Sequence, residues 1–309
     1  MVLLLNPMSG APDSWRAAFH QVLPHVEVRL WPDAGDASDI EFAFVSKMPL
    51  AELKRFPRLR LIGSMLAGVD HLVASPDLPE GIPMVRTGAP DGDPMMTEFA
   101  ILHVLRHHRR VPEYLLAQQR SEWQALPQPR TEDRRVGLLG LGSLALPVAL
   151  ALKALGFQVA SWSRTPKSVQ GIESFHGSDQ FGDFLARTDI LLNVLPLTAE
   201  TRGILDARAL AALPKGAAVI NLGRGPHLVE ADLIAALDSG HLSAATLDVF
   251  NVEPLPAGNP LWTHPKITIM PHIARRQRPI DVVPQIAENI RRLRAGEPLL
   301  QVIDLRAGY

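Results

Sequence analysis

The sequence contains no cysteine among its 309 residues. This absence excludes a disulfide framework, catalysis by a thiol and a metal site built on thiolates. Excess charge is also lacking, because 31 basic and 32 acidic side chains give a formal net charge of −1. We therefore expect neither nucleic acid nor an anionic membrane as a partner. The apolar run near the start, VLLL at 2–5, is too short for a signal or membrane span, so we expect a cytoplasmic protein.

Two glycines mark the point at which one stretch changes from strand to helix. Residues 136–139 are apolar, Gly140 and Gly142 make a sharp turn, an apolar helical run extends to Leu155, and a second strand follows at 157–162. This order predicts the βαβ unit whose helix N-terminus binds the pyrophosphate of a dinucleotide. One glycine permits the turn and the other lets backbone N–H groups approach phosphate. The cofactor-binding residues predicted here are Gly140, Leu141, Gly142, Ser143 and Leu144.

The end of the second strand indicates which dinucleotide is bound. NAD enzymes usually carry Asp or Glu there, about twenty residues after the glycines. This chain has Ser163, Arg164 and Thr165 instead. Without a carboxylate to repel a 2′-phosphate, and with a guanidinium that can bind it bidentately, NADP(H) is favoured, and NAD(H) is the other possibility. The alternative interpretation is a solvated basic turn.

Short apolar strands alternate with amphipathic stretches along the whole chain. The further strands predicted are 2–5, 26–30, 42–45, 61–64, 190–194, 218–222, 244–249 and 267–270. This alternation is typical of α/β proteins with parallel sheets. A loop rich in Gly, Pro and Asp at 88–94 indicates a hinge between two domains. The helix predicted at 282–294 most simply packs on the first domain.

The segment 97–120 predicts one long helix that its internal proline kinks or divides. His103, His107 and His108 lie near metal-ligand spacing, but no carboxylates share their face, so we expect no metal. The ordinary interpretation is a solvated or domain-bridging helix. Trp123 follows in a polar segment, and its ring needs cover from a subunit contact or from the far wall of a substrate cleft.

Polar residues follow three successive strands in the second half of the chain. Arg224 follows one strand, Asp248 and Glu253 follow the next, and His272 follows the last. Ligands bind outside the carboxyl ends of open parallel sheets. Arginine can bind a carboxylate and a keto oxygen, histidine can protonate that oxygen, and Glu253 can orient the histidine. Asp248 could accept a hydrogen bond from the nicotinamide carboxamide. Singly, each could be a surface charge or loop residue; their joint occurrence favours catalysis.

The segments GLGSLA, LLNVLPLTAETRGIL, NLGRG, DVFNVEPLP and PHIA, in this order, resemble the signature of the D-isomer-specific 2-hydroxyacid dehydrogenases. Within this family the chain is most similar to the glyoxylate/hydroxypyruvate reductase A group, in which a Ser-Arg pair at the second strand accompanies NADPH use. The resemblance spans nearly the whole chain, because AGVDHL near the front and LRAGY at the end also fit.

The resemblance implies two doubly wound parallel-sheet domains separated by a cleft. A Rossmann nucleotide domain at 97–275 would be inserted into a flavodoxin-like substrate domain formed by 1–96 and 276–309. Family members are commonly dimers that associate through the long helices of the nucleotide domain. A homodimer is therefore implied here as well.

The resemblance also implies residue roles. Arg224 would hold the substrate, His272 would donate the proton and Glu253 would support it, while Leu195 and Pro196 would line the cofactor site. The implied substrate-binding residues are Ala67, Gly68, Val69 and Arg224. The implied reaction is reduction of glyoxylate or hydroxypyruvate to the 2-hydroxy acid. Alternatives are another 2-oxo acid, such as pyruvate or an aryl pyruvate, and a non-catalytic NAD(P)-sensing binding protein of the corepressor type.

Two positions depart from the family pattern. Where close relatives often read WKPP, the chain has SKMP at 46–49, so this segment provides no aromatic wall for the pocket. After PHIA, where a small residue is usual, the chain has Arg275 and Arg276. Arginines near the acid could lower the proton affinity of His272 or recruit a second anionic group of the substrate. The alternative is that both point to solvent.

Overall fold

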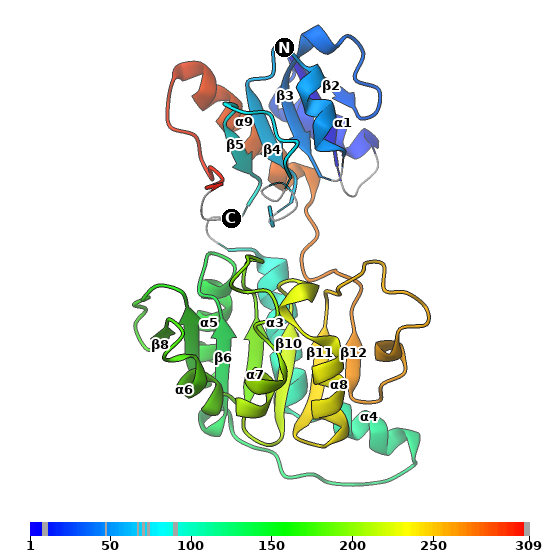
Figure 1. Ribbon diagram of the computed structural model, residues 1–309, viewed down its shortest axis with the longest axis vertical. Coiled ribbons are helices and arrows are strands. Elements are labelled where there is room, and N and C mark those ends of the chain that lie inside the picture. Colours follow the sequence, from blue (N-terminus) through cyan, green and yellow to red (C-terminus); the bar gives the residue numbers. More distant parts are fainter. Residues whose placement is uncertain are drawn as a thin grey trace. The chain divides into compact units, whose positions relative to one another are not determined.

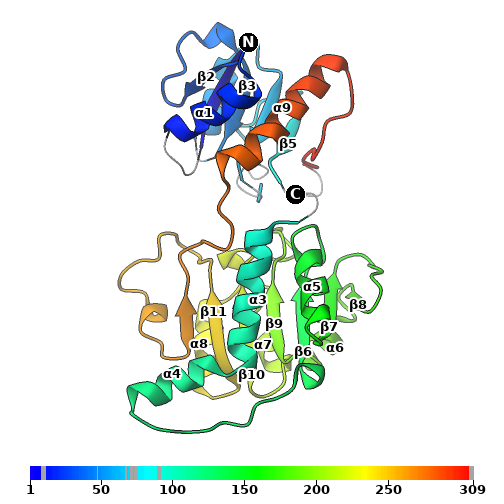
Figure 2. The same ribbon diagram turned by 180° about the vertical axis from the view of Figure 1, so that it is seen from behind.

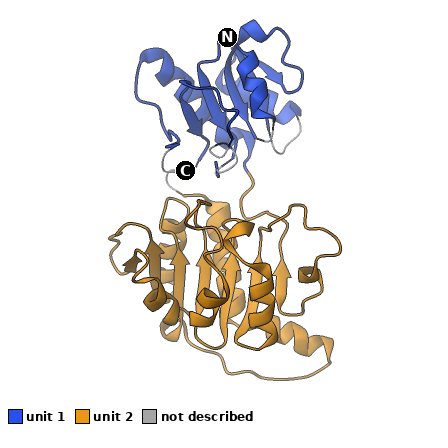
Figure 3. Ribbon diagram, viewed as in Figure 1, with its two compact units in different colours: residues 1–88, 277–309 blue, residues 89–276 orange. Residues whose placement is uncertain are grey.

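The computed structural model describes residues 1–7, 12–46, 48–66, 68–69, 72, 75–88 and 92–305. The chain divides into two compact units, a first unit of residues 1–88 and 277–309 and a second unit of residues 89–276 (Figure 3). The domain boundaries expected from the sequence, at 96/97 and 275/276, compare with divisions at 88/89 and 276/277. The assignment of the two units to substrate and nucleotide stays a prediction.

The first unit contains a five-stranded parallel sheet. In spatial order its strands are β2 (Glu27–Leu30), β1 (Val2–Asn6), β3 (Ile40–Val45), β4 (Leu61–Ser64) and β5 (Met84–Arg86). The order 2-1-3-4-5 is that of a flavodoxin-like sheet, as the family resemblance implied. Alternate residues of a strand face opposite sides, so Leu3 and Leu5 belong to one apolar core and Leu4 to the other.

The described part of the first unit also contains two long helices and two 3-10 helices. They are α1 (Pro12–Val22), η1 (Ala37–Asp39), η2 (Leu50–Arg55) and α9 (Pro279–Ala295). The α9 helix contacts α1, and Val283, Ile286 and Ile290 are buried in the core that contains Trp15 and Phe19. The C-terminal helix therefore returns to the first unit, as its apolar spacing predicted.

The second unit contains a seven-stranded parallel sheet. In spatial order its strands are β12 (Ile267–Ile269), β11 (Leu242–Leu247), β10 (Ala217–Asn221), β9 (Ile190–Asn193), β6 (Arg135–Leu139), β7 (Gln158–Ser163) and β8 (Glu173–His176). Read from β8, this is the Rossmann order 3-2-1-4-5-6 with one further edge strand. The order reverses between β6 and β9, the position at which such sheets bind dinucleotides.

Helices cover both faces of the second sheet. They are α3 (Pro94–His108), α4 (Val111–Gln119), α5 (Ala145–Ala154), α6 (Phe181–Ala186), α7 (Ala207–Ala212) and α8 (Glu230–Asp238), with the 3-10 helices η3 (Thr131–Asp133), η4 (Gly225–His227) and η5 (Pro260–Trp262). Figure 2 shows α3 over β9 with α5 beside it. The helices α6, α7 and α8 cover the opposite face (Figure 1).

All ten strands predicted from the sequence are present, with ends that shift by one or two residues. Two short strands, β5 and β8, were not predicted. Both lie at sheet edges, where a strand is paired on one side and its apolar pattern is weak. The prediction that 267–270 forms a buried strand was wrong, because β12 is an edge strand and its three residues are only partly buried.

The helix predicted at 97–120 is divided in two, as expected, but its start and the place of the division differ from the prediction. Helix α3 begins at Pro94, three residues earlier, because the Asp93 side chain accepts hydrogen bonds from the N–H groups of Met95 and Met96. The break comes at Arg110, whose φ of 57° is left-handed. The proline expected to divide the helix lies instead in the first turn of α4, where the missing N–H costs no hydrogen bond.

The histidines of α3 are buried rather than solvated. His103, His107 and His108 are 3, 7 and 3 % exposed, because their side of the helix packs against the sheet and against Phe157. Burial lowers the pKa of His103 to about 4 and that of His107 to about 3. Within the described ranges, no cluster of three or more His, Asp or Glu side chains is placed to hold a metal ion. No helix in the described part of the chain is both long and apolar enough to cross a membrane.

Candidate active site

The polar residues predicted for the site follow neighbouring strands of the second unit. The strands β6, β9, β10, β11 and β12 are adjacent and parallel, so their carboxyl ends lie along one edge of the sheet (Figure 1). The glycine turn follows β6, Leu195 follows β9, Arg224 follows β10, Asp248 follows β11 and His272 follows β12. This edge is where open parallel sheets bind their ligands.

His272 and Glu253 are in direct contact. The Nδ1 atom of His272 lies 2.7 Å from Oε2 of Glu253, and the two side chains are 42 and 28 % exposed. The other carboxylate oxygen, Oε1, accepts a hydrogen bond from the N–H of Phe250 at 3.0 Å. Because Glu253 occupies Nδ1, Nε2 is the ring nitrogen through which His272 can exchange a proton with a ligand. The contact between His272 and Glu253 that was expected from the sequence is present in the structure.

Asp248 anchors the loop that carries His272. Its carboxylate is buried, and the two oxygens accept hydrogen bonds from the N–H groups of Ile273 at 2.8 Å and Ala274 at 3.0 Å. Burial raises the pKa of Asp248, although these two hydrogen bonds act to lower it. The predicted contact with a nicotinamide carboxamide stays a prediction. The anchoring contact was not predicted, because it joins residues 25 and 26 positions apart through backbone atoms.

The turn that carries Arg224 rests on a buried polar network. The side-chain amide of Asn193 donates to Asn221 Oδ1 and to His227 Nδ1, both at 2.9 Å, and the Arg224 N–H also donates to His227 Nδ1 at 3.1 Å. Since Nδ1 accepts two hydrogen bonds, the proton of the neutral ring lies on Nε2, which donates to the carbonyl of Pro196 at 3.2 Å.

This network therefore joins the Arg224 turn to the Leu195–Pro196 segment. Asn193 Oδ1 also accepts from the Leu195 N–H at 3.1 Å, and Asn221 donates to the carbonyl of Arg224 at 3.0 Å. The sequence analysis missed Asn193, Asn221 and His227 as positioning residues. Their signal was available, because two asparagines end buried apolar strands and a polar group at such a place needs partners.

The glycine turn has the geometry that a pyrophosphate requires. Gly140 has a φ of 96°, which favours glycine, and its N–H donates to the Trp162 carbonyl at 2.8 Å. A Cβ on Gly142 would meet no atom within 4 Å, so its backbone faces open space. Helix α5 begins just beyond, and its N-cap, Leu144, supplies no side-chain hydrogen bond. The N–H groups of Ala145 and Leu146 donate to the Gly142 carbonyl at 3.1 and 2.9 Å, so the N–H groups of the turn itself, at 142–144, are those that suit an anion.

The polar residues at the end of β7 differ in their exposure to solvent. The buried Ser163 hydroxyl donates to the carbonyl of Thr165 at 2.8 Å and shapes the turn, whereas Arg164 and Thr165 are exposed. In the first unit, Val69 is buried in the core and Gly68 is partly buried. Together with Ala67, these two residues form the loop predicted to bind the substrate carboxylate, and Ala67 lies outside the described residues.

The two arginines after Ala274 differ in their surroundings. Arg275 is only 11 % exposed and its Nε lies 2.5 Å from Oδ2 of Asp93, so the interpretation that both arginines point to solvent was wrong for Arg275. Arg276 is exposed. Trp123 is fully exposed, at 102 %, so nothing in the described chain covers it. A subunit contact and a cleft wall both stay predictions for this ring.

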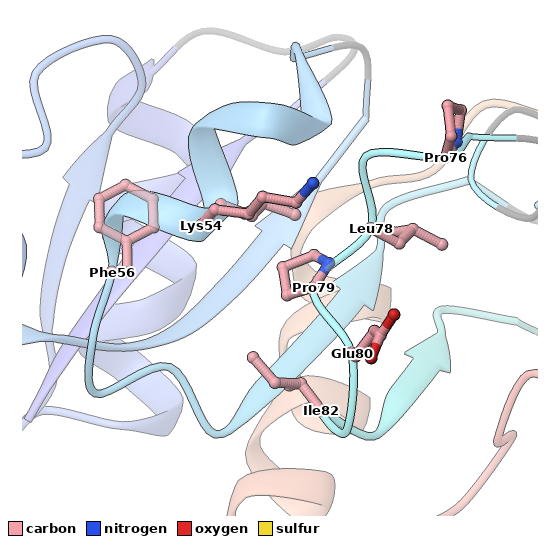
Figure 4. A pocket seen from close by; sticks show the side chains of 8 residues that line it. Lys54, Phe56, Pro76, Leu78, Pro79, Glu80 and Ile82 are labelled. Carbon is pink, nitrogen blue, oxygen red and sulfur yellow. The ribbon is translucent and has the colours of Figure 1, made fainter.

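The described part of the chain also contains a pocket away from these residues. It lies in the first unit, has a volume of about 410 Å³ and is lined by Leu53, Lys54, Phe56, Pro76, Leu78, Pro79, Glu80 and Ile82 (Figure 4). Six of its eight lining residues have apolar side chains, and none of the eight was predicted for the site from the sequence. The chemistry-bearing residues gather at the sheet edge of the second unit instead.

Comparison with known proteins agrees with this geometry. Residues 101–274 match the family model described as D-isomer specific 2-hydroxyacid dehydrogenase, NAD binding domain. A glyoxylate/hydroxypyruvate reductase A of Serratia proteamaculans is 42% identical over 100% of this chain and 99% of its own. The same name belongs to a Photorhabdus laumondii protein that is 40% identical over the same shares of the two chains.

Solved structures resemble the whole chain as well. A D-isomer specific 2-hydroxyacid dehydrogenase from Xanthobacter autotrophicus, in complex with NADPH and MES, matches with a TM-score of 0.95 and 44% identity over 100% of this chain and 99% of its own. An NADPH-dependent glyoxylate/hydroxypyruvate reductase from Sinorhizobium meliloti, in complex with NADP and sulfate, matches with a TM-score of 0.92 and 34% identity over the same shares.

Proposed function

This chain belongs to the D-isomer specific 2-hydroxyacid dehydrogenase family, and we propose that it reduces a small 2-keto acid, glyoxylate or hydroxypyruvate, to the 2-hydroxy acid with NADPH. The observation that carries the proposal is the 2.7 Å contact between His272 and Glu253 at the sheet edge that also bears Arg224. A histidine held by a carboxylate is suited to protonate a keto oxygen.

The residues around the glycine turn fit a dinucleotide. The open face of Gly142 lets a pyrophosphate approach the backbone N–H groups of the turn at 142–144, and Leu195 and Pro196 are held at the neighbouring strand end. The exposed Arg164 and Thr165 would hold the 2′-phosphate, with the guanidinium as its bidentate partner, on the turn that the Ser163 hydroxyl shapes. The relatives solved with NADPH or NADP support this preference. When bound, the cofactor supplies the hydride that reduces the keto carbon.

The protein's own residues would bind the substrate and move the proton. Arg224 would grip the substrate carboxylate and the adjacent keto oxygen with its planar fork. His272 would transfer the proton on Nε2 to the keto oxygen, while Glu253 holds Nδ1 and stabilises the charged ring before the transfer. Positioning and charge stabilisation then supply most of the decrease in the barrier.

We further propose that the protein is a cytoplasmic homodimer. Large apolar side chains are exposed on α3, on α4 and just after it: Leu102 is 57 %, Leu115 41 % and Trp123 102 % exposed. Exposed apolar groups in one region of a surface are typical of subunit contacts. Light scattering on the purified protein should give twice the mass of the 33.8 kDa chain. A monomer at micromolar concentration would contradict the dimer.

A spectrophotometric assay of NADPH oxidation tests the proposed reaction. We expect turnover with glyoxylate and hydroxypyruvate that exceeds turnover with pyruvate and phenylpyruvate. Absence of oxidation with every oxo acid would overturn the enzyme proposal. A faster reaction with an aryl pyruvate would overturn the substrate class alone, and equal kcat/KM values with NADH would overturn the cofactor preference.

A further inference from the structure

We propose that Asp93 and Arg275 form a positioning pair that fixes the loop carrying His272, an inference that rests on the proposed function. Their side chains are 15 and 11 % exposed, and Arg275 Nε lies 2.5 Å from Asp93 Oδ2. The two residues are 182 positions apart. Arg275 stands three residues after His272.

Asp93 can both cap α3 and bind Arg275 because each contact uses a different carboxylate oxygen. Oδ1 accepts from the N–H groups of Met95 at 2.9 Å and Met96 at 3.4 Å, and so caps α3. Oδ2 accepts from Arg275. The loop after β12 is therefore attached to the first turn of α3. A carboxylate is required for both contacts, because an asparagine has only one oxygen.

The helix to which Arg275 is attached is itself fixed to the strand that leads into the loop. Near its last turn, Arg106 Nη2 donates to the hydroxyl of Thr268 in β12 at 3.2 Å. His107 Nε2 lies 2.9 Å from the hydroxyl of Thr246 in β11. The contacts thus close a ring from β12 through the His272 loop, Arg275, Asp93 and α3 back to β12.

The pair adds an attachment from the side of α3 to the contacts that hold the loop from the side of β11. Asp248 holds the N–H groups of Ile273 and Ala274 from the side of β11. His272 itself has a φ of 53°, a conformation that persists in a non-glycine residue only when its surroundings hold it. Residue 276 is the last of the second unit, so Arg275 is almost the final attachment of this loop before the chain leaves the unit.

Burial makes the pair strongly coupled. Removing one partner leaves the other charge nearly enclosed and unpaired, and the loop or the helix end must move to hydrate it. Displacement of an acid by about 1 Å can lower a rate by about 100-fold. The pair should therefore affect the rate of the reduction more than the binding of the cofactor, whose glycine turn lies after a different strand.

The test is a double-mutant cycle with Asp93→Asn, Arg275→Met and the double variant. In the presence of glyoxylate and NADPH, we expect each single variant to lower kcat by about 10- to 100-fold. The double variant should be no worse than either single variant, and the NADPH dissociation constant, from fluorescence titration, should stay within about twofold. Arg275→Lys, which keeps the charge, should recover part of kcat. Arg276→Met is the matched control and should behave as wild type.

A second readout separates this inference from the proposed function. Hydrogen exchange of the Ile273 and Ala274 amides should accelerate by about tenfold or more in Arg275→Met and Asp93→Asn, and should not change in Arg276→Met. Unchanged exchange, or effects on kcat that multiply in the double variant, would overturn the positioning pair. A wild-type protein that oxidises NADPH with no oxo acid would overturn the proposed function, and the exchange result would still decide whether the pair orders the loop.

Discussion

Acidification to about pH 5 is expected to destabilise the protein through two histidines of α3. His103 and His107 are 3 and 7 % exposed. Burial is the main cause that lowers their pKa values, to about 4 and about 3, and the charge of nearby Arg106 adds to it. Both rings therefore stay neutral in the folded protein at a pH at which histidines of the unfolded chain, with a pKa of 6.5, are protonated.

The direction and size follow from proton linkage. Between pH 6.5 and pH 4 the unfolded chain binds more protons at these positions than the folded chain. The free energy of unfolding therefore has its full value above pH 6.5 and decreases as the pH falls below it. At about pH 5, roughly 1.5 units below the unfolded pKa, each histidine removes about 2 kcal/mol from the free energy of unfolding. The combined loss of about 4 kcal/mol is a large part of the roughly 5–15 kcal/mol typical of a folded domain.

Urea unfolding at a series of pH values between about 7.5 and 5 measures this loss. His103→Leu is the informative variant, because neither ring nitrogen has a hydrogen-bond partner among the described residues and the ring packs edge-on against Phe99 at 4.5 Å. It should reduce the pH dependence by about half. His176→Gln, at an exposed position, is the control. A wild-type stability that is flat over this range, or a His103→Leu variant with the full loss, would refute the reasoning.

Three further predictions concern the site. Glu253→Gln removes the charge that faces His272 Nδ1 at 2.7 Å, so kcat should fall about 10- to 100-fold with unchanged NADPH affinity; an effect on KM alone in steady-state kinetics would contradict this. Arg224→Lys keeps the charge but loses the planar fork of the guanidinium. The decrease in kcat/KM for glyoxylate should correspond to a loss of about 2 kcal/mol or more of transition-state stabilisation; wild-type kinetics would count against substrate binding by Arg224. Arg164→Glu should reverse the preference for NADPH over NADH, and an unchanged ratio of the two kcat/KM values would remove Arg164 from the cofactor site.

Much of the fold could be predicted because hydrophobic pattern and turn chemistry are local. The buried strands β6, β9 and β10 carry continuous apolar runs, and two buried asparagines end β9 and β10. The glycine turn could be located because glycine is the residue that such a sharp turn favours, and Gly140 does adopt a positive φ. The start of α3 was placed too late because its cap, Asp93, stands among prolines and glycines that suggested a loop. The edge strands β5 and β8 were missed because they are only three and four residues long and carry little apolar pattern.

The site was predictable to the extent that its residues end neighbouring strands. Topology brings such positions to one edge whatever the loops do, and this is why His272 and Glu253 could be paired from sequence. The support of the Arg224 turn could be read from the sequence only in part. The His227 ring accepts from a side-chain amide and from a backbone N–H, and the second of these contacts is independent of the donor's side chain.

Arg275 shows why charge near a catalytic group is hard to interpret from sequence. Two adjacent arginines beside a proton donor suggested an effect on its proton affinity, yet one of them is exposed and the other is neutralised by Asp93. The electrostatic consequence of a residue depends on whether a partner from a distant segment reaches it. Here that partner is the cap of a helix whose side chains are also tied to β12 and β11. The guanidinium therefore influences His272 chiefly by holding the loop in place, and its charge acts together with the carboxylate as a neutral pair.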